Sequence, residues 1–204
     1  MNLSKIFSEF IKKDKDFLEA YKIVKDNSEG KIWLIGGALS RNLVSLIYGG
    51  SKVSHDFDFI IEKPIKNIKL PKGWKIKKNK FGSPKFIGPK IDIDFVPLDN
   101  VQHIRRKKLE PTIDNFLLGV PFTIQSLAYD IKKEKVIGKI GIKALKNKTF
   151  EVYDKDSASI YSKKKNLSIE KLIKKKAKSM DFKPILCSIK VNSHDSFNST
   201  RSFQ

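Results

Sequence analysis

A short alternating segment constrains the fold of this 204-residue chain more than any other feature. Asp56 and Asp58 alternate with Phe57 and Phe59, and residues i and i+2 of a β-strand project from the same face. The sequence therefore predicts a strand that carries both carboxylates on one face and buries both phenylalanine rings on the other. A short apolar run, a glycine pair and a helical pattern precede this strand, so the expected order is strand, turn, helix, strand.

The glycine pair Gly36-Gly37 comes directly before a helix that is predicted over residues 38–48. The first amides of a helix lack intrahelical partners, and the helix dipole adds partial positive charge at this end. A triphosphate is the natural ligand there, because the glycines let the backbone approach it closely. Ser40 and Arg41, in the first helical turn, can add a hydroxyl and a guanidinium. Gly36, Gly37, Ser40 and Arg41 are therefore the predicted phosphate-binding residues.

The aspartate pair supplies the hard oxygen ligands that magnesium prefers. Magnesium keeps several of its waters, so two or three carboxylates suffice to bind it in a phosphate-transfer site. Such sites use two ions roughly 3.5–4 Å apart. A second alternating segment, residues 91–96, places Asp92 and Asp94 on one face of another strand. An isolated Asp-x-Asp pair is usually a solvated strand end, but its order with the glycine pair and the later acidic strand is far more restrictive.

Several stretches carry a family resemblance: Ile35-Gly36-Gly37-Ala38 with Arg41, His55-Asp56-Phe57-Asp58, Phe81-Gly82-Ser83-Pro84-Lys85-Phe86, the run from Ile91 to Leu98, the run from Pro121 to Asp130, and the run from Gly141 to Lys148. In this order they resemble the head domain of the polymerase-β-like nucleotidyltransferases. The most similar branch is that of the bacterial poly(A) polymerases and CCA-adding tRNA nucleotidyltransferases. The resemblance spans residues 31–154.

The resemblance implies a magnesium-dependent nucleotidyltransferase that transfers a nucleoside monophosphate from an NTP, ATP included, to an acceptor hydroxyl, with an RNA or tRNA 3′ end as the first choice of acceptor. Asp56 and Asp58 would hold both metal ions. Asp94 would be the third catalytic carboxylate, with Asp92 as the reserve candidate. The alternatives are a protein or small-molecule acceptor, or a non-catalytic RNA-binding protein on a degenerate head.

Three departures from the family pattern concern the expected substrate contacts. The helix-opening Arg-Asp pair is represented one residue later by Arg41-Asn42, where Asn42 replaces the acid. The segment 119–121 reads Gly-Val-Pro where the family has Arg-Arg-Asp. Arg105 and Arg106 lie upstream and either reach the phosphates or form a solvated basic loop. These differences predict that the chain is not a housekeeping CCA-adding enzyme.

The composition of the chain narrows the possible binding partners and the cellular compartment. The net charge is +20, from 42 basic and 22 acidic side chains, which favours a polyanion as partner, nucleic acid first. A lysine-rich proteome would give the same charge. Cys187 is the only cysteine, so neither an intrachain disulfide nor a cysteine zinc site is expected. No apolar run approaches the roughly 20 residues of a membrane helix, and a soluble cytoplasmic protein is the expectation.

The predicted fold class is α/β (α+β), a nucleotidyltransferase fold with a mixed β-sheet backed by helices. We expect an N-terminal helix within residues 1–30, the head at 31–154, a basic helical appendage at 155–191 and a disordered tail at 192–204. Ser168 is the predicted cap of one C-terminal helix that ends at Met180. The lysines of that helix face either RNA phosphates or solvent: Lys171, Lys174, Lys175, Lys176 and Lys178.

Overall fold

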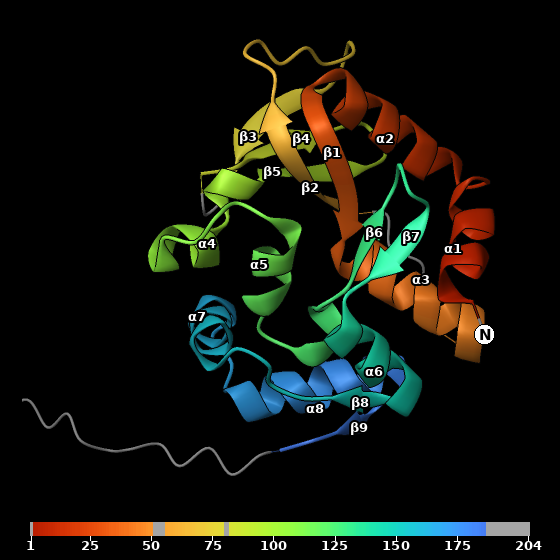
Figure 1. Cartoon of the computed structure of the whole chain (residues 1–204), viewed down its shortest axis with the longest axis vertical. Helices are drawn as coiled ribbons and strands as arrows, with labels where there is room; N and C mark the ends of the chain where they lie inside the picture. The colour runs from red at the N-terminus through yellow and green to blue at the C-terminus, as the bar shows by residue number, and fades with distance from the viewer. Residues whose placement is uncertain (1, 51–55, 80–81, 187–204) are drawn as a thin grey trace, which may run out of the picture.

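The computed structural model describes residues 2–50, 56–79 and 82–186, and its centre is a mixed β-sheet (Figure 1). Seven strands lie in the order β3-β4-β5-β2-β1-β6-β7, and a small parallel pair, β8-β9, lies apart from them. The strands are β1 Ser28–Ile35, β2 Asp56–Pro64, β3 Lys75–Lys78, β4 Pro84–Ile87, β5 Asp92–Pro97, β6 Ala128–Asp130, β7 Lys135–Ile137, β8 Thr149–Phe150 and β9 Lys183–Pro184.

Helices cover both faces of this sheet and form the end of the molecule that holds α6, α7 and α8 (Figure 1). The α-helices are α1 Leu3–Ile11, α2 Lys15–Asp26, α3 Gly36–Tyr48, α4 Gln102–Lys107, α5 Ile113–Leu118, α6 Lys139–Asn147, α7 Lys155–Lys165 and α8 Ile169–Met180. Two 3-10 turns, η1 Leu98–Asn100 and η2 Thr123–Gln125, complete the described elements. The predicted mixed sheet backed by helices is confirmed.

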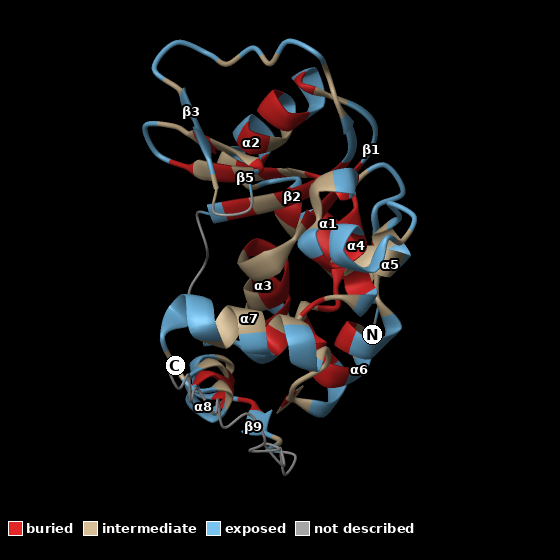
Figure 2. Cartoon of the chain, turned by 90° about the vertical axis from the view of Figure 1, so that its left-hand side faces the viewer, coloured by how far each residue is buried: buried red, intermediate tan, exposed pale blue. Residues whose placement is uncertain are grey.

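The alternation of β2 and β5 divides the sheet into two unlike faces. On one face Phe57 and Phe59 are buried against α2, where the ring of Phe17 lies 6.1 Å from each of theirs. On the other face the aspartates come first, and Ile60 and Val96 follow them under α4 and α5. Figure 2 shows the buried central strands, while β3 at the sheet edge is exposed along its length. The period-2 pattern thus separates the core from a polar face, as predicted.

The single N-terminal helix expected within residues 1–30 is two helices. α1 ends at Ile11 and α2 begins at Lys15. The reason is the cap at Asp14, whose side chain accepts a hydrogen bond from the Phe17 amide (3.1 Å). Such a cap satisfies an amide that would otherwise lack a partner, so it starts a new helix within one amphipathic pattern.

The C-terminal part has two helices where one was expected. α8 confirms the predicted helix, and Ser168 caps it by accepting from the Lys171 amide. α7 was not predicted because Ala158 is its only buried residue, so it carries almost no apolar periodicity. Its start is fixed by Asp154, which accepts from the Ser157 amide (2.7 Å).

Two further expectations concern membrane-spanning helices and the C-terminal tail. Among the helices within the described residues, none has the length and apolar character needed to cross a membrane. The predicted disordered tail, residues 192–204, lies outside the described residues, as do His55 and Cys187.

Candidate active site

The register of two parallel strands gathers the predicted carboxylates. β2 and β5 pair so that Asp56 lies beside Asp92 and Asp58 beside Asp94. Neighbouring strands are about 4.8 Å apart, and paired residues project from the same face. The structure therefore brings Asp56, Asp58 and Asp94 to one face, as the sequence predicted.

The start of α3 lies directly against Asp58. Ile35, the last residue of β1, pairs with Asp58 across the sheet, which places Gly36 over the carboxyl group. Gly36 has φ +71, and a Cβ at this position would collide with Asp58 Oδ2. The Gly37 amide hydrogen-bonds the Asp58 carboxylate. Only glycine allows this approach of helix start and acid.

Asp58 and Asp94 cannot both ionise freely. Removal from water, the adjacent Asp94 charge, a hydrogen bond between the two carboxyl groups and the Asp56 charge together raise the pKa of Asp58 to about 7. The Gly37 amide opposes this rise. Asp94 Oδ1 is buried and has no hydrogen-bond partner among the described residues. Such a pair shares one proton or binds a cation.

Asp92, the reserve candidate, has a different partner. Lys85 of β4 lies 2.9 Å from it, measured from Nζ to Oδ2, and this ion pair neutralises its charge. Lys85 also interacts electrostatically with Asp94, but its ion pair is with Asp92, and Asp94 faces Asp58. This difference favours Asp94 as the third carboxylate, which stays a prediction.

The carboxylates of the site offer oxygen ligands to a divalent metal. Within residues 2–50, 56–79 and 82–186, no three acidic, histidine or cysteine side chains are grouped as a metal site. Asp58 and Asp94 nevertheless fit a hard cation, since they offer carboxylate oxygens, excess negative charge and the buried Asp94 Oδ1. Asp56 is exposed at the start of β2, on the same face. The predicted two-ion site remains a prediction built on these acids.

The remaining predicted residues of α3 take different positions. The Ser40 hydroxyl is buried and donates to the Gly36 carbonyl (2.9 Å), within the helix itself. The Arg41 guanidinium lies over Gly37, where a Cβ would be 2.6 Å from Nη2. No side chain among the described residues caps the start of α3. Arg41 thus lies over the start of α3, beside the glycines that contact Asp58, whereas Ser40 points into the helix.

The C-terminal helices bring a further cation near Arg41 and Asp58. Lys176 of α8 is half-buried, and its pKa is lowered by desolvation and by the positive charges of Arg41 and Lys165, while Asp58 raises it. Its Nζ lies 5.4 Å from the centre of the Tyr161 ring of α7. The sequence placed Lys176 among several equivalent lysines. Its spacing of four residues from the buried Leu172 and three from the buried Ile173 was the available signal that it differs from them.

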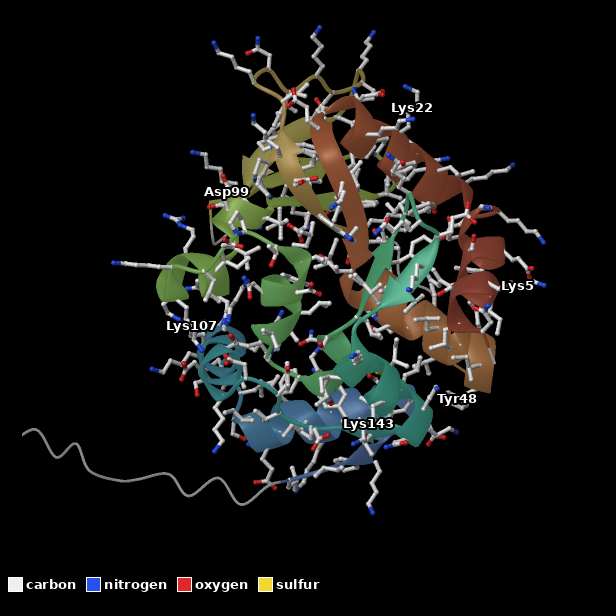
Figure 3. The ribbon with its side chains drawn as sticks, viewed as in Figure 1. Lys5, Lys22, Tyr48, Asp99, Lys107 and Lys143 are labelled. Atoms are coloured by element: carbon white, nitrogen blue, oxygen red, sulfur yellow. The ribbon has the colours of Figure 1, made fainter. Side chains whose placement is uncertain are left out.

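The other basic side chains spread over the molecule. Figure 3 shows Lys5, Lys22 and Lys143 projecting from three different parts of the surface. Arg105 Nη1 donates to Asn100 Oδ1 (3.1 Å) at the exposed side of α4. Arg106 turns the other way and lines a cavity on the carboxylate face of the sheet. Of the two arginines left open by the sequence, Arg106 therefore lies in the wall of this cavity, and neither has a contact with the three aspartates among the described residues.

Solved structures show which fold this is. A CCA-adding enzyme with ATP superposes with a TM-score of 0.57 at 20% identity, over 91% of this chain and 42% of that one. A tRNA-processing enzyme with CTP gives 0.52 at 19%, over 76% and 40%, and a CCA-adding enzyme with CTP gives 0.51 at 20%, over 77% and 38%. The chain has the polymerase-β-like nucleotidyltransferase fold. It spans 38–42% of the length of these three structures.

The sequence itself gives no match to a protein-family model or to a curated protein. Within the nucleotidyltransferase fold, the departures noted above have visible consequences. Asn42 is buried, and neither atom of its amide has a partner among the described residues. Gly119, which stands where the family resemblance implies an arginine, leaves room for His103. A Cβ at Gly119 would collide with the His103 ring.

Proposed function

We propose that this protein is a magnesium-dependent nucleotidyltransferase that moves a nucleoside monophosphate from an NTP to the 3′ hydroxyl of an RNA, a tRNA or tRNA-like molecule being the first choice. The observation that carries the proposal is the contact between the start of α3 and Asp58, with Asp94 beside it. It combines a phosphate-binding helix start with carboxylates that favour a cation.

Asp58 and Asp94, with Asp56, are the residues that would hold the metal. Magnesium bound there supplies positive charge to the phosphates and acidifies the acceptor hydroxyl. The raised pKa of Asp58 supports this role, because a bound cation relieves the repulsion that disfavours its ionised form.

The other residues position the triphosphate. The Gly36 and Gly37 amides and the dipole of α3 favour an anion, and Arg41 and Lys176 add two cations beside it. In the reaction the acceptor oxygen bonds to the α-phosphorus, the bond from that phosphorus to the pyrophosphate oxygen breaks, and the hydroxyl proton is taken up at Asp94 Oδ1. This oxygen is the buried acceptor without a hydrogen-bond partner among the described residues.

Two observations support RNA as the acceptor. The net charge of +20 favours a polyanion through phosphate contacts that need no base sequence. The structures with the same fold include CCA-adding and tRNA-processing enzymes. Because this chain covers less than half of those structures, its acceptor is part of the proposal.

The proposal is tested by incubating the purified protein with each α-labelled NTP, magnesium and total RNA. We expect label in the RNA fraction with at least one NTP, and none with Asp56→Ala or after chelation of the metal. Label in a protein fraction instead would identify a protein, and not RNA, as the acceptor. No labelled product with any NTP, or equal labelling by Asp56→Ala, would refute the enzymatic function.

A further inference from the structure

A cavity of about 280 Å³ continues the carboxylate face of the sheet. Its floor includes Ile60 and Val96, which follow Asp58 and Asp94 by two residues on the same strands. A strand rises about 3.3 Å per residue, so the floor begins roughly 7 Å from the acids. A ligand group in this cavity is therefore next to the proposed site of phosphate transfer.

The walls of the cavity are mostly apolar and come from separate elements. Phe116 of α5 and Tyr161 of α7 contribute aromatic rings, and Ile160 adds an aliphatic side chain. This apolar part of the wall suits a flat, poorly hydrated ring. The volume is at the lower end for small-molecule sites.

Polar groups reach the cavity from α4 and from other elements: Gln102, His103 and Arg106 of α4, with Asn79, Ser83, Asn100, Ser157 and Lys164. His103 and Arg106 both line the cavity, as expected for residues three apart on one helix face. His103 is only 7% exposed, and its Nδ1 has no hydrogen-bond partner among the described residues. Buried polar atoms are normally paired, so this nitrogen calls for a partner that the described residues do not supply.

Two contacts connect the walls on either side of the cavity. Lys107 extends from α4 toward α7 (Figure 3) and lies 3.9 Å from Asp154, measured from Nζ to Oδ2. Arg106 Nη2 lies 4.0 Å from Asp156 Oδ2. α7 is thus placed opposite α4 and forms part of the cavity wall.

We propose that this cavity binds a nucleobase and that His103 Nδ1 hydrogen-bonds its edge. The inference rests on the proposed function and extends it to base recognition. Burial and the neighbouring charges of Lys107 and Arg106 lower the pKa of His103, against the opposing charges of Asp154 and Asp156. The ring is therefore neutral at neutral pH, as suits an uncharged base. The base belongs either to the incoming NTP or to the 3′-terminal residue of the acceptor, and the two cases are separable.

The test compares ligands that differ only in the base. Calorimetric titrations in magnesium would use each NTP against inorganic tripolyphosphate, and a short RNA against the same RNA with an abasic 3′ residue. The proteins are the wild type, His103→Phe, Ser157→Trp and the control Lys108→Gln. His103→Phe keeps a ring over Gly119 but lacks Nδ1, and Ser157→Trp fills the cavity from α7. Lys108 is exposed at the end of α4 and does not line the cavity.

We expect the wild type and Lys108→Gln to bind one base-bearing ligand at least tenfold tighter than its baseless counterpart. His103→Phe and Ser157→Trp should each reduce this preference to threefold or less, without changing the affinity for the baseless ligand. Preference with NTPs assigns the cavity to the incoming nucleotide, and preference with RNA assigns it to the acceptor. Equal binding of all paired ligands by the wild type, or full preference in both cavity variants, would overturn the inference while leaving the proposed function intact. Binding of neither NTP nor tripolyphosphate would refute the proposed function as well.

Discussion

Asp58 and Asp94 face each other across the parallel strands β2 and β5, close enough for their carboxyl groups to share one proton. Without a metal this pair opposes folding at neutral and alkaline pH, since two buried carboxylates repel each other. Cation binding would reverse the effect. The same two residues therefore link stability, pH and the proposed activity.

The first prediction concerns pH and stability of the metal-free protein. The pKa of Asp58 is about 7 when folded, against an ordinary value of 3.8, so the folded state binds more protons between these pH values. Its contribution to stability is complete below about pH 4 and is lost as the pH rises through about 7. We expect the melting temperature of wild type relative to Asp58→Asn to fall between pH 5 and pH 8 in chelator. Magnesium should restore it at pH 8. A constant difference between the two proteins would contradict the shifted pKa.

The second prediction separates a catalytic Asp58 from a structural one. Asp58→Asn removes the charge that burial disfavours, so at pH 8 without metal we expect a gain on the order of 1 kcal/mol, since one pKa unit corresponds to about 1.4 kcal/mol. Nucleotidyl transfer should be abolished, because an amide is a poor magnesium ligand. Thermal denaturation and the labelling assay measure the two effects. A large loss of stability would make Asp58 a structural residue.

The third prediction tests the contact between helix start and acid. Gly36→Ala places a Cβ against Asp58 Oδ2 at a residue with φ +71. Gly73→Ala is the matched control, because Gly73 has φ +88 and nothing within 4 Å of its Cβ position. Backbone strain costs on the order of 1–3 kcal/mol at such sites, and the overlap at Gly36 should add about 1–3 kcal/mol. Urea denaturation measures both. Equal losses in the two variants would show that the contact with Asp58 is not tight.

The fourth prediction assigns one lysine of α8 to the site. Lys176 lies near Arg41 and Asp58, whereas Lys174 is exposed and pairs with Glu170 on its own helix. We expect Lys176→Gln to weaken NTP binding about tenfold, or about 1.4 kcal/mol, and Lys174→Gln to change it less than twofold. Titration of NTP and of inorganic tripolyphosphate should show the same loss, since the lysine would contact phosphates. Equal effects of both substitutions would show that Lys176 contributes only to the general surface charge and does not contact the phosphates.

Period-2 alternation made the central strands predictable. It placed Asp56, Asp58 and Asp94 on one face and the phenylalanines in the core, because a strand fixes which side chains share a side. It did not give the register of β2 against β5, which depends on strands far apart in the sequence. The Lys85–Asp92 ion pair, which distinguishes Asp92 from Asp94, depends in turn on the pairing of β4 with β5.

The C-terminal helices show where sequence reasoning failed. α7 has Ala158 as its only buried residue, so hydrophobic periodicity could not reveal it, and the cap at Asp154 was its one local signal. The place of Lys176 beside the site depends on how α8 packs against α7 and α3. Such tertiary contacts are not encoded in the spacing of lysines along one helix.

The most direct measurement compares the two aspartates of β5, Asp92 and Asp94, which lie two residues apart. Nucleotidyl transfer from labelled NTP to RNA in magnesium should be measured for wild type, Asp94→Asn and Asp92→Asn, with melting temperatures to show that each protein is folded. Asp94 faces Asp58, whereas Asp92 pairs with Lys85. We expect Asp94→Asn to lose transfer by about 100-fold or more, equivalent to about 2.7 kcal/mol of transition-state stabilisation, and Asp92→Asn to retain most of it. Wild-type transfer by a folded Asp94→Asn protein would contradict an Asp58–Asp94 catalytic centre.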